Sequence, residues 1–283
     1  MNVTTAQRSR RLRELLAAGP VMMPGAFNAL SAKMIERTGF DALYLSGAVL
    51  ANSVGGVPDI GLMTLTEARD HAEKIARSTA LPILMDADTG YGGADNAAHC
   101  VRTLEAVGVS GIHLEDQEFP KRCGHLDGKK LVPVDEFCRK IEAAAAAKAS
   151  ADFVIIARTD ARGVDGFDAA VTRARRYLDA GADGIFPEAL ADADEFARFA
   201  REVGGLLLAN MTEFGKTPYL TADAFAQMGY RMIIYPVTLQ RLVMKTVEDG
   251  LTELKDAGTQ KNLVPRMQTR AALYDLLGYD PTK

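Results

Sequence analysis

The sequence predicts a (β/α)8 barrel of the TIM type. Eight short apolar runs, often β-branched, alternate with longer stretches that have helical spacing. Continuous apolar runs of this length are typical of strands buried on both faces of a parallel sheet. Eight strand and helix pairs within about 250 residues are typical of a barrel. A doubly wound open sheet is the alternative, but the turn "PGAFNAL" after the first strand lacks the glycine spacing of a dinucleotide-binding loop.

The eight predicted strands each combine an apolar run with a polar or turn-forming end, which is where a strand should stop. In chain order they are VMMPGAF from Val21, ALYLSG from Ala42, LPILMDAD from Leu81, GIHLED from Gly111, FVIIARTD from Phe153, GIFPEA from Gly184, LLLANM from Leu206 and MIIYPVT from Met232.

Helical stretches fill the intervals between these strands. AEKIARSTA and DEFCRKIEAAAAAKAS each precede a strand, and GFDAAVTRARRYLDAGADG runs through a helix into the glycines that end it. After Arg241 the chain is helical, then a loop and another helix follow, with no ninth strand to pair with them. We therefore expect one barrel domain over 1–283, with a C-terminal helical extension over about 240–283 that caps the barrel or reaches a neighbouring subunit.

Composition and charge narrow the class of protein. The chain has 283 residues, 48% hydrophobic and 25% charged, with a net charge of −4. The sequence has no block of basic residues of the kind that binds nucleic acid. No apolar run is long enough to cross a membrane, and the N-terminus is too charged for a signal peptide. Three cysteines form no dense framework, which favours a reducing compartment. We expect a soluble cytoplasmic protein that binds neither nucleic acid nor membrane.

Polar side chains end nearly every predicted strand. Any one of them could be a helix cap, but the carboxyl ends of barrel strands converge on one mouth, where barrel enzymes build their active sites. In chain order these residues are Ser46, Asp86, Asp88, Glu115, Asp116, Arg158, Asp160, Glu188, Asn210, Thr212 and Tyr235.

The segment DADTGYGG contains the most distinct acidic cluster of the sequence. Asp86 and Asp88 lie two positions apart on a strand, so both carboxylates should point to one face. Two carboxylates on one face repel each other unless they share a cation, and oxygen ligands suit Mg²⁺. Glu115 could join them directly or through water. The alternative is a pair of solvated carboxylates beside a flexible glycine turn.

Arginines offer sites for an anionic substrate. Arg158 has a planar fork that suits a carboxylate, unless it forms a structural ion pair with Asp160 or Glu188. Arg241 and Arg270 are further candidates, although by spacing alone they are more typical of surface charges.

For several other residues, the sequence pattern is compatible with a place in the hydrophobic core as well as at the mouth. Tyr44 alternates with Ser46 on its strand, so it could face the mouth or fill the barrel interior. His113, inside an apolar strand, is more typical of a core histidine. Cys100 and Cys138 lie on helical faces that should pack into the core.

The third cysteine has a different setting, in the segment FPKRCGH. Cys123 lies beside Lys121, Arg122 and His125, and nearby positive charge makes a thiol proton labile. Such a thiol can act as a general acid toward a carbanion. Together with a Mg²⁺ site and arginines for carboxylates, this favours enolate chemistry, in which a C–C bond breaks beside a metal that stabilises the negative charge.

These motifs together resemble the isocitrate lyase/phosphoenolpyruvate mutase superfamily, from about Met23 to Tyr279. The segments that carry the resemblance are PKRCGH, SGA, DADTGYG, LEDQ, ARTDA, FPEA, ANMTEFGKTP, YPVT and GTQKNLVPRMQTR. KRCGH is similar to its carbon–carbon lyases, and ANMTEFGKTP and MQTR favour those that act on 2-methylisocitrate. The resemblance implies Mg²⁺ as cofactor and a barrel whose eighth helix is exchanged between paired subunits of a homotetramer. It also implies cleavage of this hydroxy tricarboxylate to pyruvate and succinate, in the methylcitrate cycle of propionate catabolism.

The resemblance also implies roles for individual positions. Asp86 and Asp88 match metal ligands, and Cys123 matches a proton donor on a mobile gating loop, with Lys121 and His125 beside it as catalytic residues. The positions that match substrate contacts are Ser46, Gly47, Ala48, Asp59, Gly124, Arg158, Glu188, Asn210, Thr212, Arg241 and Arg270. No motif fixes the base that removes the substrate hydroxyl proton, and Tyr44 is the candidate.

Other activities remain open at this point. A 2,3-dimethylmalate lyase or an oxaloacetate hydrolase would keep the same metal and cysteine motifs, because substrate choice rests on a few pocket side chains. Isocitrate lyase itself is a poorer match, since its relatives carry a long inserted region. A barrel that only binds a ligand is a different class, and it would have no use for a labile thiol.

Overall fold

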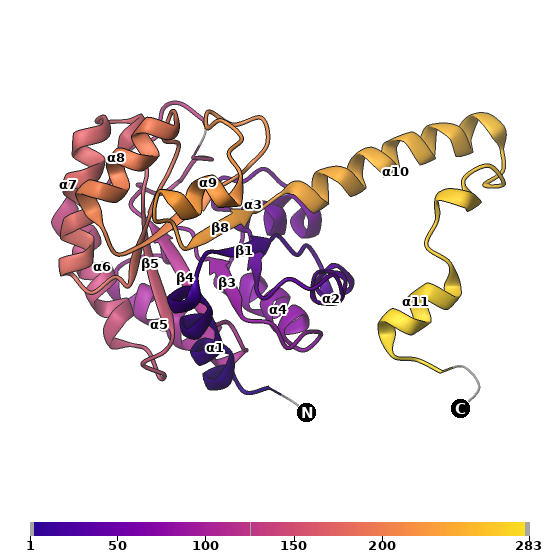
Figure 1. Cartoon of the computed structure of the whole chain (residues 1–283), viewed down its shortest axis with the longest axis horizontal. Coiled ribbons are helices and arrows are strands. Elements are labelled where there is room, and N and C mark those ends of the chain that lie inside the picture. Colours follow the sequence, from indigo (N-terminus) through magenta and orange to yellow (C-terminus); the bar gives the residue numbers. More distant parts are fainter. Residues whose placement is uncertain (1–2, 125, 281–283) are drawn as a thin grey trace.

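Eight parallel strands close into a barrel in the computed structural model, which describes residues 3–124 and 126–280 (Figure 1). Around the barrel the order is β1, β8, β7, β6, β5, β4, β3, β2, and the circle is completed by a bridge between Gly25 and Tyr44. The strands are β1 (Val21–Pro24), β2 (Leu43–Leu45), β3 (Ile83–Asp86), β4 (Gly111–Glu115), β5 (Val154–Thr159), β6 (Gly184–Pro187), β7 (Leu206–Asn210) and β8 (Met232–Tyr235). The predicted fold class is confirmed, and each predicted apolar run contains one strand.

Helices cover the outside of this barrel. Several begin at a polar N-cap; Thr64, for example, accepts the backbone N–H of Glu67, whose carboxylate accepts the N–H of Thr64 in return. The helices are α1 (Thr5–Ala18), α2 (Ala29–Arg37), the short α3 (Gly47–Val49), α4 (Leu65–Ala76), α5 (Ala94–Ala106), α6 (Val134–Ala146), α7 (Phe167–Asp179), α8 (Ala193–Val203) and α9 (Ala222–Gln227).

The hydrophobic core has two layers. The larger lies between strands and helices and includes Cys100 and Cys138, as predicted. The smaller fills the barrel itself, and there Leu12 and Leu16 of α1 join inward-facing strand residues such as Ile156. Since α1 leads directly into the start of β1, it closes the end of the barrel where the strands begin. Only the other end, where the strands stop, is left to form a mouth.

The C-terminal part forms an arm. α10 (Thr238–Ala257) runs away from the barrel, and α11 (Arg270–Leu277) lies apart from it beside α2, where Asp275 pairs with Arg37 at 2.8 Å (Figure 1). α10 buries none of its side chains, and its Leu242 and Leu251 are 62% and 60% exposed. Neither α10 nor any other helix in the described ranges is long and apolar enough to cross a membrane. Among the described residues of one chain, Leu239 at the start of α10 packs against the barrel core, and the apolar side chains further along the helix are exposed.

Candidate active site

Two carboxylates converge at the mouth beside the end of β2. Asp86 ends β3, and its two oxygens accept the backbone N–H groups of Asp88, at 3.0 Å, and Gly47, at 3.1 Å. A Cβ added to Gly47 would lie 3.0 Å from an oxygen of Asp86 and 3.3 Å from one of Asp88. Asp88 lies beyond the strand with a φ of 47°, a left-handed conformation that aspartate tolerates. The predicted pairing therefore occurs, but a turn produces it rather than strand alternation.

Lys121 ties the loop after β4 to these acids. Its ammonium is 2.9 Å from Asp88 Oδ1 and also contacts the carboxylate of Asp59, and the side chain is almost fully buried. Burial alone would lower the pKa of Lys121, but the surrounding carboxylates, Glu115 first among them, raise it, so the lysine stays protonated. Burial raises the pKa of Asp88 to about 6, against the opposing effect of Lys121.

The acceptors at the mouth fit a hydrated divalent cation. Glu115 Oε1 is buried and accepts no hydrogen bond, whereas Asp88 Oδ1 faces the Lys121 ammonium at 2.9 Å, and burial raises the pKa of Glu115 well above its ordinary value. Within the described ranges, no three His, Cys, Asp or Glu side chains lie close enough to hold a metal by themselves. Mg²⁺ needs no such cage, because it binds through one or two carboxylates and keeps several waters. Asp86 and Asp88 would suit that role, and the unpaired oxygen of Glu115 would suit a hydrogen bond from a water on the cation.

Arg158 lies inside a cage of carboxylates. Its guanidinium nitrogens are 3.0 Å from Asp160, 3.3 Å from Glu115 and 3.1 Å from Glu188. Burial would lower the pKa of Arg158, but these carboxylates raise it well above its ordinary value. The ion-pair interpretation is therefore confirmed, and the same cluster holds the guanidinium fork at the mouth, where a substrate carboxylate could meet it.

The loop that carries Cys123 is folded down onto this cluster. A Cβ on Gly124 would lie 2.5 Å from Glu188 Cγ and still closer to Arg158, so only glycine fits this approach. Cys123 is partly buried beside it. The structure thus packs Gly124, the residue after Cys123, against Arg158 and Glu188. His125, also predicted to be catalytic, lies outside the described residues.

Tyr44 and His113 lie beneath the mouth, in the barrel interior. The Tyr44 hydroxyl is 2.7 Å from His113 Nε2, and His113 Nδ1 is 3.7 Å from Asp86. Burial lowers the pKa of His113 to about 4, so the ring is neutral and shares one hydrogen bond with the Tyr44 hydroxyl. Burial also raises the pKa of Tyr44 well above its ordinary value. Tyr44 therefore keeps its proton, and the geometry gives no support to its predicted role as a base.

Other predicted substrate contacts surround the mouth. Ser46 is the N-cap of α3 and accepts the N–H of Val49, so Gly47 and Ala48 form the turn at the end of β2. Asn210 ends β7, and the oxygen of its side-chain amide, Oδ1, is buried without a hydrogen-bond partner. Thr212 follows two residues later. A buried acceptor without a donor is unfavourable unless a ligand or water supplies one, which favours a binding role for Asn210.

Two predicted arginines are not part of this cluster in a single chain. Arg241, in the first turn of α10, is about half-exposed and lies 3.7 Å from Glu213 and over the ring of Phe214. Arg270 begins α11 and is exposed on the arm, away from the mouth (Figure 1).

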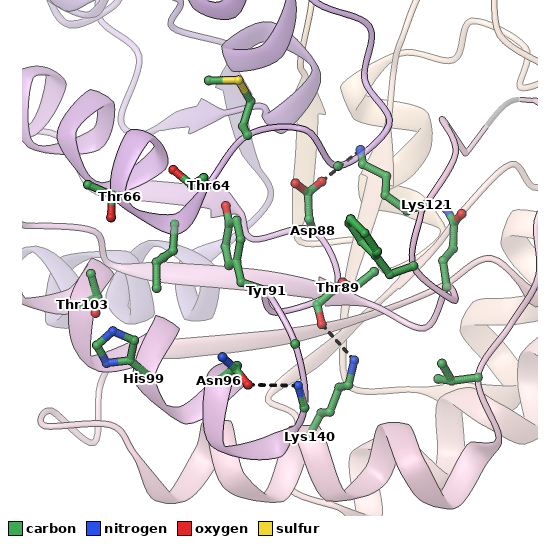
Figure 2. A pocket seen from close by; sticks show the side chains of 18 of the residues that line it. Thr64, Thr66, Asp88, Thr89, Tyr91, Asn96, His99, Thr103, Lys121 and Lys140 are labelled. Atoms are coloured by element: carbon green, nitrogen blue, oxygen red, sulfur yellow. Dashed lines mark hydrogen bonds and ion pairs between the residues drawn. The ribbon is translucent and has the colours of Figure 1, made fainter.

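A cavity of about 820 Å³ lies beside the mouth rather than in it (Figure 2). Asp88 and Lys121 form part of its wall, and its lining does not include Cys123, Arg158 or Glu188. The rest of the wall comes mainly from α4, α5 and α6, with Thr64, Thr66, Asn96, His99, Thr103 and Lys140. The cavity therefore reaches Asp88 and Lys121, while Gly124 of the loop after β4 packs against Arg158 and Glu188.

Two buried residues of this loop have no role among the sequence-based predictions. Gln117 binds the backbone of Arg122, and Lys129 binds the carbonyl of Gly124 and the carboxylate of Asp160. Gln117 belongs to the LEDQ segment, which could have marked it. Lys129 has no local signal, because its partner Asp160 lies on another loop.

Residues 12–255, which include all eight strands and the mouth, match the family described as phosphoenolpyruvate phosphomutase. The chain belongs to this family. The chain is 51% identical to "Probable 2-methylisocitrate lyase 1" of Corynebacterium glutamicum, over 98% of this chain and 92% of the relative. It is 49% identical to a 2-methylisocitrate lyase of Aeropyrum pernix, over 95% and 86% of the two chains. Members of this family thus include carbon–carbon lyases, and the resemblance seen in the motifs is confirmed.

Solved structures of the phosphoenolpyruvate phosphomutase family share the fold closely. A 2,3-dimethylmalate lyase superposes with a TM-score of 0.90 at 37% identity, covering 98% of this chain and 92% of that one. An oxaloacetate acetylhydrolase with a bound inhibitor gives 0.92 at 35% identity, covering 96% and 94%. A phosphonopyruvate hydrolase in complex with oxalate and Mg²⁺ gives 0.86 at 30% identity, covering 96% and 95%. The family barrel therefore supports several reactions of small carboxylates.

Proposed function

We propose that the protein is a Mg²⁺-dependent lyase that cleaves 2-methylisocitrate to pyruvate and succinate, in the cytoplasm, as part of propionate catabolism through the methylcitrate cycle. The observation that supports this proposal is the loop after β4, in which Gly124, the neighbour of Cys123, packs against Arg158 and Glu188, and Lys121 contacts the Asp88 carboxylate. The names of the relatives favour this substrate over others.

The chain's own residues would divide the work of cleavage. Arg158 and Asn210 bind substrate carboxylate and hydroxyl oxygens, and the SGA turn holds the part that becomes pyruvate. The substrate hydroxyl releases its proton to solvent, from which the Cys123 thiolate later regains one. The C–C bond breaks as the ketone forms, and the electrons of that bond pass to the succinate fragment. Cys123 donates a proton to that carbon and becomes a thiolate. Asp86 and Asp88 would hold Mg²⁺, which would supply positive charge to stabilise negative charge on substrate oxygens.

Substrate selectivity provides the direct test. We expect kcat/KM for 2-methylisocitrate to exceed that for isocitrate by about 10–200-fold, because one methyl group in an apolar pocket contributes roughly 1–3 kcal/mol. The measurement is pyruvate or glyoxylate release from each substrate with Mg²⁺ present. Equal efficiency on both would reject this substrate assignment.

The same assay separates the alternatives favoured by the structural relatives. A preference for 2,3-dimethylmalate or oxaloacetate would replace the substrate and leave the family chemistry in place. No turnover on any of these compounds would favour a barrel that only binds a ligand.

We also propose that α10 is the exchanged eighth helix and that the assembly is a homotetramer. The support is the apolar face of α10, which is exposed in one chain. A site for Arg270 in substrate binding requires that the arm reach a mouth in this assembly. Sedimentation should give a species of four chains, and Leu242→Glu with Leu251→Glu should give smaller ones. A wild-type monomer at micromolar concentration would exclude the exchange.

A further inference from the structure

The backbone on the N-terminal side of Cys123 is held by one buried amide. Gln117 is 1% exposed, and its side chain donates to the carbonyl of Arg122 and accepts the N–H of the same residue, both at 2.9 Å. One side chain thus pairs with both backbone groups of the residue before Cys123, as a neighbouring strand would. The backbone of Arg122 cannot turn without losing both hydrogen bonds.

The backbone on the C-terminal side is held by a buried ion pair. The ammonium of Lys129 donates to the carbonyl of Gly124 and lies 2.7 Å from Asp160 Oδ1, and both side chains are almost fully buried. Asp160 also binds Arg158, with its Oδ2 3.0 Å from the guanidinium Nε. A continuous chain of contacts therefore runs from Gly124 through Lys129 and Asp160 to Arg158.

Stability alone does not account for the buried Lys129–Asp160 ion pair. A buried ion pair is often no more stabilising than an apolar pair of the same volume, because desolvating both charges offsets their attraction. What a buried ion pair and a bidentate amide do provide is a defined position. Position matters for a proton donor, since a displacement of about 1 Å can lower a catalysed rate by about 100-fold.

We propose that Gln117 and Lys129 are positioning residues that fix the Cys123 sulfur over the mouth, and that Lys129 acts through Asp160 to link this position to Arg158. The proposal rests on the proposed role of Cys123 as proton donor. Removing either side chain frees the backbone beside the cysteine. Removing Lys129 also leaves Arg158 as the remaining cation beside Asp160. The Asp160–Arg158 ion pair is then stronger, and Asp160 competes with a substrate carboxylate for the guanidinium of Arg158.

The two substitutions should therefore affect different kinetic constants. Gln117→Met should lower kcat by about 10–100-fold with KM nearly unchanged, whereas Lys129→Met should lower kcat similarly and also raise KM. Lys129→Arg, which keeps a cation beside Asp160, should recover much of the KM effect. Lys130→Met is the matched control, because Lys130 is exposed and contributes only its backbone carbonyl to the loop, so it should behave as wild type.

A second readout does not depend on turnover. In substrate-free protein, the alkylation rate of Cys123, followed by mass spectrometry, should rise in Gln117→Met and Lys129→Met and stay unchanged in Lys130→Met. If a methionine variant does not fold, Gln117→Asn, whose amide is one methylene too short, and Lys129→Gln, which keeps a polar side chain without the charge, serve in its place. Labelling and kinetics equal to wild type in folded Gln117 and Lys129 variants would overturn the proposal. If wild type releases no pyruvate, the proposed function fails, and labelling still tests the positioning.

Discussion

Replacing the sulfur of Cys123 with oxygen, in Cys123→Ser, should lower kcat by at least about 100-fold, because general acid catalysis typically contributes about 10²–10⁴-fold. A hydroxyl is a far weaker acid than a thiol, so protonation of the succinate carbanion becomes rate-limiting. Substrate affinity should stay nearly unchanged, since Arg158 and the SGA turn remain in place. Steady-state kinetics with 2-methylisocitrate and saturating Mg²⁺ measures both constants.

Cys138→Ser is the matched control for this substitution. Cys138 lies on α6, outside the loop that carries Cys123, and its sulfur approaches the carbonyl of Arg176 at 3.7 Å, so a serine hydroxyl can take over that contact. Burial raises the pKa of Cys138 and raises that of Cys100 to about 12, which makes both thiols slow nucleophiles. Alkylating agents should therefore modify Cys123 first, and bound products should protect it. Normal turnover by Cys123→Ser would exclude the thiol as the acid.

Neutralising the carboxylate of Asp88 should lower turnover by at least about 1,000-fold, because charge stabilisation by a metal is worth several kcal/mol. The structure determines which substitution is informative. Asp88 has a φ of 47°, so Asp88→Ala would strain the backbone, whereas Asp88→Asn keeps the shape and tolerates a left-handed conformation. Turnover is measured as pyruvate release, with circular dichroism to show that the variant is folded.

Asp95→Asn provides the control for the loss of a negative charge, since Asp95 is exposed at the start of α5. Its activity should equal that of wild type. Chelation of wild type should abolish turnover, and added Mg²⁺ should restore it. Full activity in excess chelator, or in Asp88→Asn, would contradict the metal assignment.

The sequence predicts the scaffold well because burial on both faces gives each barrel strand a continuous apolar run. Ile83 to Met85 and Val154 to Ile156 are such runs, and the polar residues that end them mark the mouth without knowledge of any contact. Asp86, Asp88, Arg158 and Glu188 could therefore be placed together from topology alone.

Long-range pairing is the part that local patterns do not specify. The Lys129–Asp160 and Tyr44–His113 pairs join residues 31 and 69 positions apart, on separate strands or loops. Whether Tyr44 faces the mouth or the interior depends on the tilt of its strand in the closed barrel, which alternation does not fix. Burial then sets its pKa, and with it the protonation state that a sequence-based assignment has to assume.

Because α1 closes the end of the barrel where the strands begin, it decides how the protein can be attached to a solid support. Leu12 and Leu16 bury one face of α1 in the barrel floor, while Thr4 just before it is exposed. A tether joined to the N-terminus would therefore leave from the side opposite the mouth, and an enzyme immobilised through it would present its catalytic end to the substrate solution. A tether joined after α11 would instead extend from the arm, which is the segment proposed to be exchanged between subunits.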